Sequence, residues 1–198
     1  MKSKMKHRVP IGNYIVLVLM SVIFLIQFHG DPQQVYLNGL ILQAPTFSGF
    51  FGYFWLHECP IHIVSNMLLL IVFGRAVSTK MNHSKYFLVY IMLGIAAGIG
   101  HAIFDGRDVI GSSGAISGVM GMAIVLSWKK LSPMGPWLVL IWLAISIAVS
   151  ASGTSHDAHV AHISGFVAGM MVAILLVTFN HADGTDTDPA IKPAFEKP

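Results

Sequence analysis

The amino-acid sequence predicts an all-α, polytopic membrane protein folded as one bundle of six transmembrane helices. Of its 198 residues, 55% are hydrophobic and only 11% are charged, whereas soluble domains carry about 25% charged residues. The mean hydropathy is +0.69. The single cysteine, Cys59, excludes an internal disulfide. The few basic residues form no broad patch of the kind that binds nucleic acid.

Six apolar segments are candidates for membrane-spanning helices, each of which needs about 20 mostly apolar residues. They are residues 12–28, 61–78, 86–104, 113–128, 136–151 and 160–179. The first segment follows a basic stretch, as the apolar part of a signal peptide does. No small-x-small cleavage site follows it, so we expect it to be retained as a helix.

The lysine and arginine residues orient these segments, because cytoplasmic loops collect them. With a cytoplasmic N-terminus, eleven of the twelve Lys and Arg residues fall on the inner side, and only Arg107 falls outside. We therefore expect both termini in the cytoplasm.

The predicted organisation is a cytoplasmic N-terminal tail at residues 1–11, a membrane domain at 12–180 and a polar cytoplasmic tail at 181–198. The C-terminal tail is polar and contains prolines, so we expect it to be disordered. Residues 29–60 form a long outer loop within the membrane domain. Residues 35–56 of this loop are fairly apolar but contain Pro45 and several glycines. We expect it to lie in the membrane interface, anchored by Trp55 and several Phe residues.

Small residues mark the faces along which the fourth and sixth helices are expected to pack. Gly114-x-x-x-Gly118 and Gly165-x-x-x-Gly169 both permit close contact between helices. Gly121 extends the first stripe. Both helices start at the outer side in this orientation, so residues near their first turns lie at similar depth.

Polar side chains inside such helices are costly and often mark a functional site. Ser113 begins the fourth helix, and His162 lies on the glycine face of the sixth. A neutral imidazole at hydrogen-bond distance can activate a serine hydroxyl. His62 and Asn66, four residues apart on one face of the second helix, can donate to the developing oxyanion. Because the spans contain no Asp or Glu, a Ser–His dyad is expected rather than a triad.

Three motifs carry a resemblance to a known family. They are H-x4-H-x3-N at His57, His62 and Asn66, G-x-S-G at Gly111, Ser113 and Gly114, and A-H-x2-G-x3-G at His162, Gly165 and Gly169. In this order they resemble the rhomboid intramembrane serine proteases of the basic six-helix bacterial type, over about residues 10–180. The resemblance implies Ser113 as nucleophile, His162 as base, and His62 with Asn66 as oxyanion donors. It gives supporting roles to Gly111, Gly114, His57, Gly165 and Gly169.

The sequence departs from the family pattern in two places. Many members carry a Trp-Arg pair in the first outer loop, and residues 29–56 contain none. Some members place an aromatic residue four positions after the nucleophile, where it stacks on the catalytic histidine. Ser117 occupies that position here, so another group must hold His162.

Other histidines leave alternatives open. His57 could be structural, gating or chemical. His156, Asp157 and His159 precede His162, and their role stays undecided. The stretch "HECPIH" resembles the H-E-x-x-H motif of zinc proteases. However, its two histidines are five residues apart, and Pro60 between them is expected at a helix start. We therefore expect no metal and no other cofactor.

The resemblance implies an intramembrane serine endopeptidase that cleaves transmembrane segments of other membrane proteins through an acyl-enzyme. It implies a multi-pass protein of a bacterial inner membrane, with the active site opening to the outer face. Its partners would be transmembrane substrates and the lipid bilayer. The alternative is a catalytically silent rhomboid-like protein that binds membrane clients. Because Ser113 and His162 are both present, the enzyme is the better interpretation.

Overall fold

The computed structural model describes residues 9–31, 46–131, 135, 137–142, 144 and 159–182 of the chain. The regular elements within these residues are helices. They are α1 (Ile11–His29), α3 (Phe47–Gly52), the 3-10 turn η1 (Tyr53–Trp55), α4 (Pro60–Leu69), the π-helical turn η2 (Leu70–Gly74), α5 (Arg75–Ser78), α6 (His83–Phe104), α7 (Ser113–Leu131) and α9 (His159–Ala182).

Four of the six predicted spans correspond to helices long and apolar enough to cross a membrane. They cover Ile11–His29, Pro60–Ser78, His83–Phe104 and His159–Phe179. The fourth predicted span is the shorter apolar helix Ser113–Ser127, because the backbone leaves helical geometry at Ser127. Within the predicted span 136–151, the structure describes residues 137–142 and 144, which are helical. Helix α9 continues to Ala182, two residues into the predicted tail at 181–198, and the rest of that tail and most of the tail at 1–11 lie outside the described residues.

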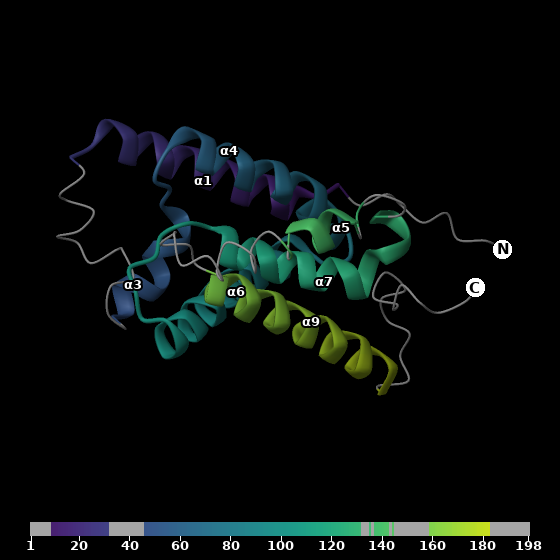
Figure 1. Ribbon diagram of the computed structural model, residues 1–198. Helices are drawn as coiled ribbons and strands as arrows, with labels where there is room; N and C mark the ends of the chain where they lie inside the picture. Colours follow the sequence, from purple (N-terminus) through teal and green to yellow (C-terminus); the bar gives the residue numbers. More distant parts are fainter. Residues whose placement is uncertain are drawn as a thin grey trace.

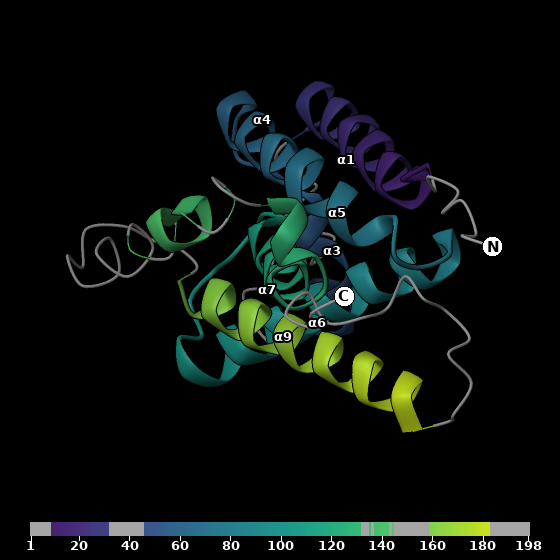
Figure 2. The same cartoon turned by 90° about the vertical axis from the view of Figure 1, so that its right-hand side faces the viewer.

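Helix α7 occupies the centre of the bundle. Figures 1 and 2 show it between the α1 and α4 layer and α9, with α6 alongside. The expected glycine contact is confirmed, since a Cβ added to Gly165 would overlap the Gly114 carbonyl oxygen. A Cβ on Gly169 would likewise overlap the carbonyl of Gly118. The two backbones touch, and this brings the first turns of α7 and α9 together.

The apolar segment Pro60–Ser78 contains the π-helical turn η2, which widens the helix locally. Asn13 of α1 is fully buried against this turn, and its Nδ2 donates to the Leu70 carbonyl at 3.0 Å. The Tyr86 hydroxyl donates to Asn13 Oδ1 at 2.8 Å, and the Asn13 backbone N–H donates to Ser78 Oγ at 3.3 Å. We call Asn13, Leu70, Ser78 and Tyr86 the Asn13 cluster. It ties α1, the widened helix and α6 together near the start of α1.

The structure describes the second half of the outer loop from residue 46 on, where it forms α3 and η1. Thr46 caps α3 by accepting from the Gly49 N–H at 3.1 Å. Trp55 is half-buried, with its ring centroid 5.7 Å from that of Tyr90 on α6, so it packs onto the bundle instead of projecting from it. Phe47 and Phe51 remain exposed. Gly94 of α6 lets the neighbouring Phe54 ring pack closely as well, since a Cβ there would lie 2.8 Å from that ring.

Candidate active site

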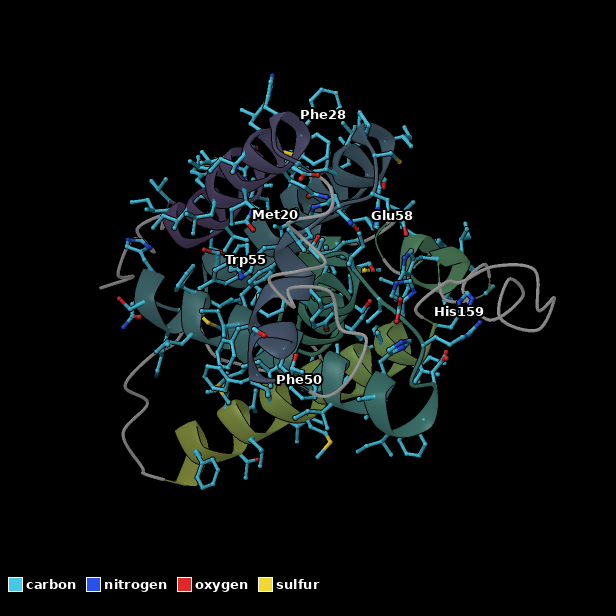
Figure 3. All side chains as sticks on the ribbon, turned by 90° about the vertical axis from the view of Figure 1, so that its left-hand side faces the viewer. Met20, Phe28, Phe50, Trp55, Glu58 and His159 are labelled. Carbon is cyan, nitrogen blue, oxygen red and sulfur yellow. The ribbon has the colours of Figure 1, made fainter. Side chains whose placement is uncertain are left out.

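The predicted site residues gather at the end of the bundle where α4, α7 and α9 begin, which we call the site end. Ser113 is the first residue of α7, and His162 and His62 lie in the first turns of α9 and α4. Figure 3 looks onto this end, with Glu58 and His159 on the same side of the bundle. Pro60 occupies the first turn of α4, as expected, and this fixes where the helix bearing His62 starts.

The structure brings Ser113 and His162 into contact. The distance from His162 Nε2 to Ser113 Oγ is 2.7 Å, a short hydrogen bond between two helices. Both side chains are half-buried. An imidazole at this distance can take the hydroxyl proton as the oxygen attacks a carbonyl carbon.

Gly111 brings the ring of His62 beside this pair. The φ angle of Gly111 is 123°, in a region that L side chains rarely adopt. A Cβ added there would lie 2.8 Å from His62 Cε1 and 3.8 Å from Ser113 Oγ. A side chain at position 111 would therefore displace His62. Glycine lets the imidazole lie close to the nucleophile, where the oxyanion would form.

Asn66 lies one turn further along α4 and is buried, with 3% of its surface exposed. Its Nδ2 has no hydrogen-bond partner among the residues that the structure describes. A buried amide donor without a partner costs about 1–3 kcal/mol. Such a group is suited to a ligand atom that arrives only during reaction, as an oxyanion does.

Sequence reasoning missed a second Ser–His contact, which joins His57 to the serine directly before Ser113. The distance from His57 Nε2 to Ser112 Oγ is 3.0 Å, and both side chains are fully buried. Burial therefore distinguishes the two serines, because a substrate can reach half-buried Ser113 but not Ser112. Desolvation by burial, followed by the neighbouring His62, lowers the pKa of His57 to about 4. His57 is thus neutral at physiological pH.

An aromatic ring beside His162 was also missed. The centroid of Trp142 is 5.1 Å from that of His162, with the planes tilted by 48°. The ring of His159, one turn before His162, lies perpendicular to it at 6.2 Å. The sequence indicated only that Ser117 has no aromatic ring to stack on His162. In the structure the Ser117 hydroxyl donates to the Ser113 carbonyl. His156 and Asp157 lie outside the described residues.

The described part of the chain contains no group of three or more His, Cys, Asp or Glu side chains arranged to hold a metal ion. His57 precedes α4, whereas His62 lies within it, and their rings meet edge to face at 5.2 Å. The described side chains at the site end supply a serine hydroxyl, imidazole rings and an amide donor.

Comparisons with known proteins identify relatives of this chain. RHOMBOID-like protein 4 of Arabidopsis thaliana is 26% identical over 131 residues, which cover 64% of this chain and 33% of that protein. RHOMBOID-like protein 6, mitochondrial, of the same plant is 29% identical, covering 62% and 41%. Rhomboid protease GluP of Bacillus subtilis (strain 168) is 30% identical over 128 residues, covering 61% and 24%. The matched segment thus spans a quarter to two-fifths of these relatives.

Residues 44–179 match the family profile described as the Rhomboid domain. The matched segment includes every motif of the site end and well over half of the chain. The apolar helices and this match make the chain an integral membrane protein, and it belongs to the rhomboid family.

Proposed function

We propose that this protein is an intramembrane serine endopeptidase that hydrolyses peptide bonds in or near transmembrane segments of other membrane proteins. The observation that carries the proposal is the 2.7 Å contact between His162 Nε2 and half-buried Ser113 Oγ. The family includes the rhomboid protease GluP, and this supports the same class of reaction.

The proposed reaction proceeds by acyl transfer. Ser113 Oγ bonds to the substrate carbonyl carbon while its proton passes to His162 Nε2. His62, Asn66 Nδ2 and the backbone N–H of Ser113 donate to the resulting oxyanion. The C–N bond then breaks, and His162 gives its proton to the leaving amine. Water attacks the acyl-enzyme with His162 again as base, which releases the acid and restores Ser113.

The membrane arrangement is part of the proposal. Six spans, with both termini in the cytoplasm, would place the site end at the outer face of a bacterial inner membrane. This orientation rests on eleven of the twelve Lys and Arg residues falling on the inner side. Helices that begin at Ser113 and His159 would keep the reacting groups near the membrane surface, where water is available.

Labelling with a fluorophosphonate tests the nucleophile. We expect the wild type and Ser112→Ala to be labelled and Ser113→Ala and His162→Ala to remain unlabelled. Labelling that persists in Ser113→Ala, or that disappears only in Ser112→Ala, would transfer the role to another residue. Wild-type protein that never labels and leaves a model transmembrane substrate intact would favour a client-binding rhomboid-like protein.

A further inference from the structure

The second Ser–His contact lies directly beside the first but cannot perform the same chemistry. The side chains of His57 and Ser112 are both fully buried, so no peptide carbonyl can approach Ser112 Oγ. A buried hydrogen bond between two side chains that are 55 residues apart instead fixes two segments relative to each other.

Ser112 controls the start of α7. Its carbonyl accepts the first helical bond, from the Ile116 N–H at 2.9 Å, so Ser112 is the N-cap residue and Ser113 follows it directly. The preceding residue is anchored as well, because the Gly111 N–H donates to the Tyr53 carbonyl at 2.9 Å. Two consecutive residues before the nucleophile are therefore held by the segment 53–57.

His57 also contacts the donor side of the site. Its ring meets the ring of His62 edge to face, with centroids 5.2 Å apart and an interplanar angle of 77°. One side chain thus touches the residue before the nucleophile and the residue expected to bind the oxyanion.

Helix α1 holds the backbone of His57. Gln27 Nε2 donates to the His57 carbonyl at 2.8 Å, and the His57 N–H donates to Gln27 Oε1 at 3.0 Å. This double hydrogen bond restrains the segment that carries His57. The connection therefore runs from α1 through His57 and Ser112 to the first residue of α7.

We propose that His57 and Ser112 form a buried positioning pair that sets the Ser113 hydroxyl relative to His162 and His62, an inference that rests on the proposed function. Reaction rates are sensitive to displacements of about 1 Å, which can cost about 100-fold. The low pKa of His57 supports the assignment, because a neutral ring keeps the same hydrogen bond across physiological pH.

The test compares two buried serines on the same chain. Ser112→Ala removes the contact with His57. Ser127→Ala is the matched control, since Ser127 is also buried and its hydroxyl donates to the Ala76 carbonyl at 3.1 Å, far from the site end. We expect Ser112→Ala to lower kcat by about 10- to 100-fold with little change in KM. Ser127→Ala should retain the wild-type kcat per folded molecule.

Four further variants separate positioning from a loss of folding. His57→Gln can place an amide nitrogen near the position of Nε2 and should retain more activity than His57→Leu. Ser112→Ala should cost less in the His57→Leu background than in the wild type, because the contact with His57 is already gone and only the hydrogen bond with Tyr90 remains to be lost. If Ser112→Ala does not yield folded protein, Ser112→Cys keeps the volume, weakens the hydrogen bond and should show an intermediate kcat.

The outcomes distinguish this inference from the proposed function. Wild-type kcat in Ser112→Ala or Ser112→Cys, or fully additive losses in the double variant, would overturn the positioning pair while activity that requires Ser113 is retained. A wild-type protein that neither labels nor cleaves would overturn both.

Discussion

The Asn13 cluster and the site end lie near opposite ends of α1, and they differ in whether their buried amide groups are fully hydrogen-bonded. Near the start of α1, the side-chain amide of Asn13 bonds through both its nitrogen and its oxygen, to the Leu70 carbonyl and the Tyr86 hydroxyl. At the site end, Asn66 Nδ2 lacks a partner among the described residues, and Ser113 remains half-buried. About 21 Å of helix separates Asn13 from Gln27, which clamps the site end.

The difference teaches what a polar group contributes inside a membrane bundle. A buried amide that is bonded at both ends holds helices together, because separating them would leave its partners unpaired in lipid. A buried amide that keeps an unused donor adds little to folding and remains available to a ligand. We therefore expect substitutions in the Asn13 cluster to change the stability of the protein and substitutions at the site end to change its reaction rate.

The largest expected effect comes from Asn66→Leu. Removing one preorganised oxyanion donor lowers kcat by about 100-fold or more. The thermal midpoint in detergent should stay level or rise, because the variant removes a buried donor that lacks a partner in the described structure. Steady-state cleavage and thermal unfolding measure the two quantities. A variant that unfolds readily but keeps its kcat would place Asn66 with the structural residues.

The converse variant is Asn13→Leu, which changes stability and not rate. The Leu70 carbonyl and the Tyr86 hydroxyl each lose their partner, so we expect a loss of about 2 kcal/mol in the free energy of unfolding. Reversible unfolding measures this loss, and kcat per folded molecule should match the wild type. An unchanged stability would show that the widened turn does not need Asn13.

An effect of pH on stability is expected through His57. Its folded pKa of about 4 lies below the usual 6.5, so the unfolded chain binds this proton first as pH falls. The contribution of His57 to stability is fully present above about pH 6.5 and is lost on acidification toward about pH 4. The slope is at most about 1.4 kcal/mol per pH unit. Unfolding measured from pH 7 to pH 4 should show a shallower acid loss in His57→Gln, and equal slopes would contradict the assignment.

The smallest predicted effect is that of Trp142→Leu. The indole lies 5.1 Å from His162 and can stabilise the imidazolium that forms as Ser113 gives up its proton. A cation–π contact of about 1 kcal/mol corresponds to about a fivefold loss of kcat. Trp142→Phe should lose less, since it keeps an aromatic face. Leu and Phe variants with the same kcat would argue against an electronic role for this ring.

The amino-acid sequence determined four of the six predicted spans and the faces along which α7 and α9 pack. Apolar length placed α1, α6 and α9 within three residues of their predicted ends, because hydrophobicity acts locally along a helix. The glycine spacings identified the α7–α9 contact, since only residues without a Cβ let two backbones touch. Together these facts sufficed to bring Ser113 and His162 to one place.

Only the tertiary structure decided which side chains support that pair. The contacts of His57 with Ser112, Gln27 with His57, and Trp142 with His162 join residues that are 55, 30 and 20 positions apart. Helical periodicity tells which face of a helix a residue occupies, but the neighbour that meets that face depends on how several helices pack at once. The same packing buried Ser112 and left Ser113 half-buried. In the sequence these two adjacent serines differ only in their place in the G-x-S-G motif, because the burial of each depends on how the helices pack around it.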